Sequence, residues 1–87
     1  MPHHVVLLND NEHTFDYVID MLMANFSMPE DQAIEHAMEV HMNGRTIVMT
    51  CEKEEAETGH DRIHGCGADS RVPQSRGSMK AAVEPAE

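Results

Sequence analysis

A continuous apolar run that stops in a cluster of polar side chains is the feature that most constrains this chain. Residues 5–8 (Val-Val-Leu-Leu) are apolar at every position, which predicts a strand that is buried on both faces. Residues 9–14 then supply amide, carboxylate, imidazole and hydroxyl groups without a Gly or Pro. A strand that ends in hydrogen-bond acceptors just before a helix can hold a positive group. That group is either the N-terminus of the next helix or a ligand, and the pattern alone leaves both interpretations open.

Two amphipathic helices are predicted after this turn. From Phe15 to Phe26 the apolar residues recur every three or four positions, which is the period of a helix with one buried face. Thr14 is a suitable N-cap for it, because a hydroxyl can accept a hydrogen bond from a free backbone N–H. A second helix is expected to begin with Pro29 at its first position and to stop at Gly44. Its inward-facing residues are expected to be Ala33, Ala37, Val40, His41 and Gly44.

The second half of the chain predicts a strand, a helix, a loop and a final strand. Residues 45–51 are rich in Thr, Ile and Val, which are typical of strands. Residues 52–64 are expected to form a third helix, residues 68–78 a loop and residues 79–83 a last strand. The resulting order is β-α-α-β-α-β. Because two helices are consecutive, this order fits an α+β fold better than a doubly wound sheet.

The length and composition indicate one small domain. The chain has 87 residues, so we expect a single domain over residues 1–87, with a core at residues 5–84, a short lead at 1–4 and a frayed tail at 85–87. No apolar run approaches the roughly 20 residues that cross a bilayer, and no signal-peptide pattern is present. The two cysteines make a poor disulfide framework. We therefore expect a cytosolic protein with free thiols and no membrane association.

The charge is strongly negative and unevenly placed. The formal net charge is −10. Residues 1–43 contain eight acidic residues and no Lys or Arg, so they carry −8, and residues 44–87 carry −2. Such a chain repels phosphate, which argues against nucleic acid as a partner. It attracts cations, including the protonated amino groups of peptides.

The turn and its neighbouring histidine also have a purely structural interpretation. Asn and Asp side chains bond their own backbone, so residues 9–11 could simply form a strand-to-helix turn. A histidine on an inner helical face, such as His41, is more often a core residue than a ligand. A small structural or metal-binding interaction domain is therefore the alternative to a ligand-binding one.

The remaining polar residues allow two further hypotheses, a metal site and a cysteine hydrolase. His60, His64 and Cys66 have a spacing that suits zinc. Such a site needs a fourth ligand, with Cys51 as the candidate, and the paired Cys motifs of zinc sites are missing. We therefore expect no metal. A hydrolase that uses Cys51 with His41 is less favoured still, because nothing near Cys51 in the sequence lowers its pKa.

Four stretches of the chain are characteristic in combination. They are residues 5–10, Thr14-Phe15, the segment Val40-His41-x-x-Gly44-Arg45, and Ala56-Glu57. Together they resemble the ClpS family, the N-degron adaptors of bacterial Clp proteases, over nearly the whole chain. The resemblance implies a three-stranded antiparallel sheet packed with three helices, without enzymatic activity or a cofactor. Family members bind the first residue of a protein when it is Phe, Tyr, Trp or Leu, and pass the substrate to an AAA+ unfoldase.

The resemblance also implies which residues bind the peptide. The α-amino group would be bound by Asn9, Asp10, Asn11 and His41. The hydrophobic pocket would be lined by Leu7, Val18, Ala37, Val40 and Met79, with His13 and Phe15 at its rim. A free α-amino group has a pKa of about 7.7–8.0, so at neutral pH it is mainly a cation with three N–H donors. Amide, imidazole and carboxylate groups can accept from those donors, whereas a backbone amide inside a chain offers one donor and no charge.

The chain departs from the family pattern in its expected site. Asn11 replaces a carboxylate near the α-amino group, which should weaken ammonium binding. His13 stands where Thr is common and Phe15 where Met is common, so a bulkier mouth is expected. Ala37 replaces a large Met, so we expect a reshaped pocket that also admits Ile or Val. Family adaptors carry a disordered N-terminal extension that engages the unfoldase, whereas four residues precede the expected first strand here, which leaves delivery open.

Overall fold

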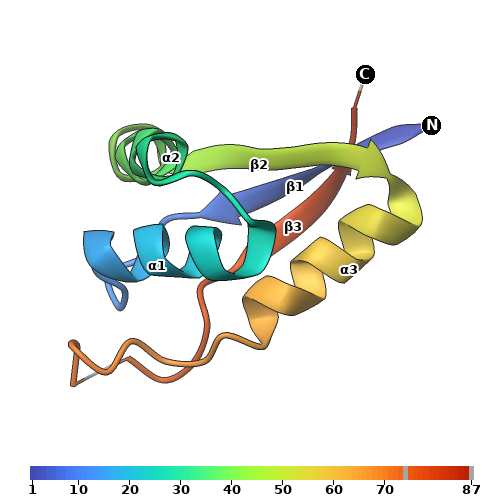
Figure 1. Ribbon diagram of the computed structural model, residues 1–87. Helices are drawn as coiled ribbons and strands as arrows, with labels where there is room; N and C mark the ends of the chain where they lie inside the picture. The colour runs from blue at the N-terminus through green and yellow to red at the C-terminus, as the bar shows by residue number, and fades with distance from the viewer. Residues whose placement is uncertain (74, 87) are drawn as a thin grey trace.

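The chain folds into strands and helices in the predicted order (Figure 1). The computed structural model describes residues 1–73 and 75–86. Within them the strands are β1 (Pro2–Leu8), β2 (Arg45–Glu52) and β3 (Ala81–Pro85). The helices are α1 (Phe15–Phe26), α2 (Glu30–Asn43) and α3 (Lys53–His64). The predicted α+β class and its β-α-α-β-α-β order are confirmed.

The first strand lies in the middle of the sheet, which explains its continuous apolar run. The strand order is β2-β1-β3, and both neighbours of β1 are antiparallel to it, as the family resemblance implied. Val5 lies opposite Met49 on one side and Val83 on the other. Strand β1 is therefore paired along both edges, and Val5, Val6 and Leu7 are completely buried.

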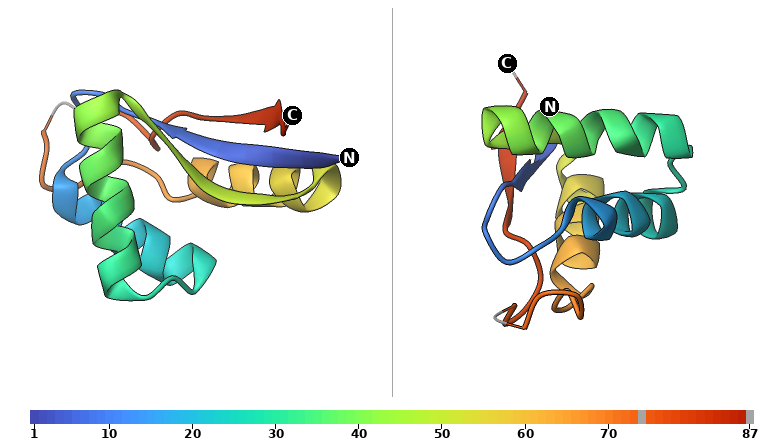
Figure 2. Two further views of the ribbon diagram at one scale, coloured as in Figure 1. Left: turned by 90° about the horizontal axis from the view of Figure 1, so that it is seen from above. Right: turned by 90° about the vertical axis from the view of Figure 1, so that its left-hand side faces the viewer.

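The helices are arranged in two ways around this sheet. Helix α3 lies along one face of the sheet and contacts all three strands, α2 crosses near the start of β2, and α1 packs on α2 and α3 (Figures 1 and 2). Their apolar faces and the sheet share one core, to which the helices contribute Val18, Leu22, Ala37, Val40, Ala56 and Ile63. None of the helices in the described residues is long and apolar enough to cross a membrane.

Several element boundaries differ from those expected. Strand β1 begins at Pro2, because residues 2–4 pair with the end of β2. Strand β3 extends to Pro85, which pairs with His3, and Glu87, the last residue of the expected frayed tail, lies outside the described residues. Pro29 precedes α2 as its N-cap with an extended backbone, not as its first helical residue. Met79 lies before β3 and is buried.

Candidate functional site

The turn that follows β1 is held next to the end of α2. The backbone N–H of Asn9 donates a hydrogen bond to the carbonyl of Gly44, at 3.0 Å. Gly44 is the C-cap of α2 and has φ 85°, a left-handed conformation that favours glycine. On its other side, the N–H of Leu8 donates to the carbonyl of Lys80. The residues after β1 and the last turn of α2, including His41, therefore meet at one end of the molecule.

The residues expected to bind an α-amino group are partly exposed at this end. Asn9, Asn11 and His41 are all exposed. The Phe15 ring stacks on the His41 ring, with their centroids 5.4 Å apart and their planes at 16°. The structure thus brings the turn, the start of α1 and the end of α2 together around a pair of stacked rings.

The position of His41 corrects one expectation. It was expected on the inner face of α2, whereas its side chain is exposed. The inner face is formed by Ala33, Ala37 and Val40. Successive residues of an α-helix are separated by about 100° around its axis, so the residue after Val40 lies at the edge of the buried stripe. There it reaches Phe15 and remains accessible to solvent.

Other residues of the same turn are committed to internal hydrogen bonds. The Asp10 carboxylate accepts from the backbone N–H of Glu12 at 2.9 Å and lies 2.8 Å from Nδ1 of His13. The Nε2 atom of His13 lies 2.6 Å from the carbonyl oxygen of Gly77. Both partners of the ring are acceptors. A neutral imidazole can donate only one of these two bonds, whereas an imidazolium donates both.

This network places His13 inside the molecule, which differs from its expected place at a pocket rim. Its side chain is only 2 % exposed. Its ring also lies 4.6 Å from the ring of Tyr17, measured between centroids. The imidazole turns inward because Asp10 and Gly77 supply acceptors there for both ring nitrogens. The bulk predicted at the mouth of the pocket would therefore come from Phe15 alone.

Thr14 caps α1 as predicted and has a further partner that the sequence did not indicate. Its hydroxyl oxygen accepts from the N–H of Tyr17, at 3.1 Å. Its own N–H and hydroxyl both donate to Oδ2 of Asp69, each at 2.7 Å. Asp69 is almost completely buried. Burial opposes its ionisation, but the hydrogen bonds from Thr14 and Arg71 outweigh burial and lower the pKa of Asp69 from 3.8 to about 2.

Sequence reasoning missed Asp69 because no local pattern identifies it. It is separated from Thr14 by 55 residues, and its neighbours have the composition of an ordinary loop. The only local signal is an Asp placed to bond its own backbone, and its carboxylate indeed accepts from the N–H of Arg71 at 2.9 Å. That signal predicts a turn but not a partner in the distant N-terminal part of the chain.

The structure brings together the residues expected to line a hydrophobic pocket. Leu7, Val18, Ala37, Val40 and Met79 belong to one core cluster and are at most 2 % exposed. Phe15 is partly exposed and packs against this cluster. The five side chains thus form a closed apolar cluster with Phe15 at its edge. Their role as a pocket remains a prediction.

Comparison with protein families identifies the family of this chain. The family described as "ATP-dependent Clp protease adaptor protein ClpS" matches residues 1–73. The chain belongs to the ClpS family. ClpS adaptors are non-catalytic, which agrees with the prediction that the chain is not an enzyme.

Individual ClpS proteins are similar over most of the chain. It is 35 % identical to the adapter ClpS of Synechococcus elongatus over 69 residues, which cover 78 % of this chain and 73 % of the relative. It is 34 % identical to the chloroplastic Clp protease adapter CLPS1 of Arabidopsis thaliana over 77 residues, covering 87 % of this chain. The chain spans about half of that relative, 48 %. The relatives thus come from bacteria and from a chloroplast.

A solved structure of the family is also closely similar in fold. ClpS2 of Agrobacterium tumefaciens, bound to L-phenylalaninamide, superimposes with a TM-score of 0.83 at 29 % sequence identity. The similarity covers 98 % of this chain and 96 % of that one. The two chains therefore share one fold from end to end.

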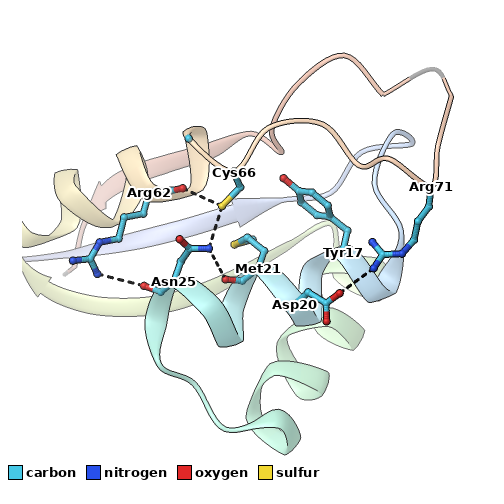
Figure 3. A pocket seen from close by; sticks show the side chains of 8 residues that line it. Tyr17, Asp20, Met21, Asn25, Arg62, Cys66 and Arg71 are labelled. Atoms are coloured by element: carbon cyan, nitrogen blue, oxygen red, sulfur yellow. Dashed lines mark hydrogen bonds and ion pairs between the residues drawn. The ribbon is translucent and has the colours of Figure 1, made fainter.

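A cavity that is separate from the expected peptide site lies between α1 and the end of α3. It has a volume of about 410 Å³ and is shown in Figure 3. Its lining is formed by Tyr17, Asp20, Met21, Asn25, Arg62, Gly65, Cys66 and Arg71, a different set from the residues expected at the peptide site. The hydroxyl of Tyr17 donates to the carbonyl of Gly67, and burial raises the pKa of Tyr17 to about 12.

Neither cysteine has the environment of a reactive thiol. Burial raises the pKa of Cys66, whose sulfur accepts a hydrogen bond from Asn25. Burial, followed by the charges of Glu55 and Glu52, raises the pKa of Cys51. Nucleophilic cysteines need a lowered pKa, so the structure gives no support to a cysteine hydrolase.

The three residues whose spacing suits zinc, His60, His64 and Cys66, are not arranged around a common point. The rings of His60 and His64 stack with centroids 6.0 Å apart and planes at 11°. The Cys66 thiol instead donates to the carbonyl of Arg62. Over residues 1–73 and 75–86, the structure contains no group of three or more His, Cys, Asp or Glu side chains that could hold a metal ion.

Proposed function

We propose that this chain binds the free N-terminal residue of a peptide or protein when that residue is large and hydrophobic. The observation that carries the proposal is that exposed Asn9 is bonded to Gly44 at the end of α2, where exposed His41 stacks on the partly exposed ring of Phe15. It is supported by the similar ClpS2 structure, whose ligand L-phenylalaninamide has a phenylalanine side chain and a free α-amino group.

The α-amino end of the ligand would lie against the turn. A protonated amine offers three N–H donors, and the amide oxygens of Asn9 and Asn11 and a ring nitrogen of His41 are accessible acceptors. The acidic first half of the chain favours a cation there. The Asp10 carboxylate is already bonded to Glu12 and His13. It would therefore support the first peptide units by fixing the turn and by its charge.

The side chain of the first residue would lie against the closed apolar cluster. Because Leu7, Val18 and Val40 are already fully buried, a ligand side chain has to make room. Phe15 is the residue that would move, since its ring is partly exposed at the edge of the cluster. Burying a Leu or Phe side chain contributes about 1.5–3 kcal/mol. The short side chain of Ala37 would leave room for a β-branched residue once Phe15 moves, which is why Ile and Val are proposed beside Phe, Tyr, Trp and Leu.

The biological role that we propose is that of an adaptor for a Clp AAA+ unfoldase in the cytosol. Support comes from membership of a family described as Clp protease adaptors. Binding of an N-terminus and delivery to an unfoldase are separate properties, and the first can be measured alone.

The direct test is fluorescence anisotropy with labelled peptides that differ only in their first residue. We expect saturable binding of a Phe-initiated peptide and at least about tenfold weaker binding when Ser replaces Phe, because the apolar contribution is lost. Leu-, Ile- and Val-initiated peptides then test the pocket. Equal binding of the Phe and Ser peptides would contradict the proposal, and a preference for Phe alone would contradict the reshaped pocket.

A further inference from the structure

We propose that Asp69 is a positioning residue for the N-terminal-residue site, although it lies outside that site. It belongs to the segment between α3 and β3, which runs back past α1 towards the turn after β1 (Figures 1 and 2). The inference rests on the proposed function. It assigns Asp69 the task of holding Thr14, and through Thr14 the turn and the first residue of α1.

The contact between the two segments involves three consecutive residues of the turn. The carboxylate of Glu12 accepts from the N–H of Arg76 at 3.1 Å. His13 faces the carbonyl of Gly77 at 2.6 Å, and its Nε2 lies 3.4 Å from Oγ of Ser75. The two donors of Thr14 both reach Asp69. The segment therefore bonds to the turn at three successive positions, and these bonds fix the place and the orientation of the turn.

Asp69 is the best-satisfied member of this contact. Its side chain is fully buried. One oxygen accepts twice from Thr14, and the other accepts from the N–H of Arg71 at 2.9 Å and from its guanidinium at 3.3 Å. Its own N–H donates to Oγ of Ser75. A buried carboxylate is tolerated only when such partners surround it, so its position is strictly determined.

Arg71 connects the same group to the outer side of α1. Its guanidinium also pairs with the exposed Asp20, at 2.9 Å, as Figure 3 shows. The two carboxylates thus share one arginine but differ in their second partner. Only Asp69 reaches Thr14, whereas Asp20 lies in the second turn of α1, in the lining of the cavity. Asp20 is therefore a matched control for Asp69.

Movement of Thr14 would be transmitted directly to the peptide site. The next residue, Phe15, carries the ring that stacks on His41. The preceding residues carry Asn9 and Asn11, the proposed α-amino ligands. Binding groups need to be held within about 0.5 Å of their productive positions by a supporting set of contacts. Loosening Thr14 should therefore weaken recognition of the α-amino group in molecules that remain folded.

The test compares Asp69→Asn with Asp20→Asn well below the unfolding temperature of each variant. Asparagine keeps the shape of the side chain but replaces one acceptor oxygen with a donor. We expect Asp69→Asn to reduce the preference for a Phe-initiated peptide over its N-acetylated form by at least about fivefold, and Asp20→Asn to change it by less than about twofold. The amide hydrogen of Thr14 should exchange faster in Asp69→Asn only.

A measurement on the unaltered protein gives a second, independent result. If the Asp69 contact strengthens peptide binding, then peptide binding strengthens that contact by the same factor. Saturation with the Phe-initiated peptide should therefore slow amide exchange at Thr14 and Arg71 more than at amides of α3. Unchanged exchange at both amides would overturn the inference.

The outcomes separate this inference from the function on which it rests. If the unaltered protein binds no Phe-initiated peptide, both are overturned. If it binds the peptide and Asp69→Asn retains the full preference for the free amino group, only the role of Asp69 is overturned. A lower unfolding temperature with an unchanged preference would assign Asp69 to stability alone.

Discussion

The turn after β1 contains two kinds of polar residue, one bonded within the protein and one exposed to solvent. Asp10 and His13 turn inward and bond to their own segment and to Gly77. Asn9 and Asn11, which flank Asp10, are exposed. One short segment can therefore serve both as a structural turn and as the proposed binding surface. The inward residues fix its shape, and the outward residues are left available to a ligand.

Removing an inward residue should cost mainly stability. We expect His13→Ala to lower the free energy of unfolding by about 2–3 kcal/mol, because it leaves the Asp10 carboxylate and the Gly77 carbonyl without their partner. Urea denaturation measures this, with Asn11→Ala as the control. The control should change the value by less than about 0.5 kcal/mol, as is usual at exposed positions. Equal effects of the two substitutions would remove the distinction.

Removing an outward side chain should weaken peptide binding and leave the stability nearly unchanged. Asn9→Ala and His41→Ala are each expected to weaken binding of a Phe-initiated peptide by about 1–3 kcal/mol, since an N–H of the bound amine loses its acceptor. Their unfolding free energies should stay within about 0.5 kcal/mol of the unaltered protein. Anisotropy and denaturation on the same samples separate the two effects. A loss of stability that accounts for the whole loss of binding would refute the assignment.

Adding a negative charge at an outward position should strengthen peptide binding by a smaller amount. Asn11→Asp places a carboxylate near the proposed ammonium and should tighten binding by less than about 1 kcal/mol, because the position is exposed. The gain should shrink as salt is raised from about 0.05 to 0.5 M. Titrations at both salt concentrations test this. A gain that does not depend on salt would point to a change in shape and not in charge.

Asp69, the buried partner of Thr14, should make the stability depend on pH at low pH. The pKa of Asp69 is lower in the folded chain, about 2, than its ordinary value of 3.8. Protonation therefore favours the unfolded chain, so the contribution of Asp69 to stability is complete above about pH 4 and is lost as the pH falls towards 2. The stability advantage over Asp69→Asn should shrink over this interval in urea titrations. A constant difference between the two proteins would contradict the shift.

The sequence was sufficient to predict the elements that depend only on residues close to one another in the chain. The apolar period of α1, its Thr14 cap and the Gly44 stop of α2 are local signals, and each lies where it was expected. The residues assigned to the apolar pocket also meet in one cluster. Their meeting could be predicted because the family resemblance supplied their spatial relation. Local patterns and the family resemblance together were therefore enough to predict the fold.

The inward half of the turn was beyond the reach of local patterns. The bonds from His13 to Gly77 and from Thr14 to Asp69 span 64 and 55 residues. They depend on the path of a segment that has no periodic pattern. The exposure of His41 was missed for another reason, because a step of one residue around a helix is enough to move a side chain from the core to its edge.

The central claim is that this turn recognises a free α-amino group, and one comparison tests it most directly. Anisotropy would be measured for a Phe-initiated peptide and for the same peptide with its N-terminus acetylated. Acetylation removes the charge and two of the three donors while leaving the phenylalanine side chain intact. The account predicts that the acetylated peptide binds at least about tenfold more weakly, the scale expected for losing charged hydrogen bonds. Equal affinity for the two peptides would contradict it.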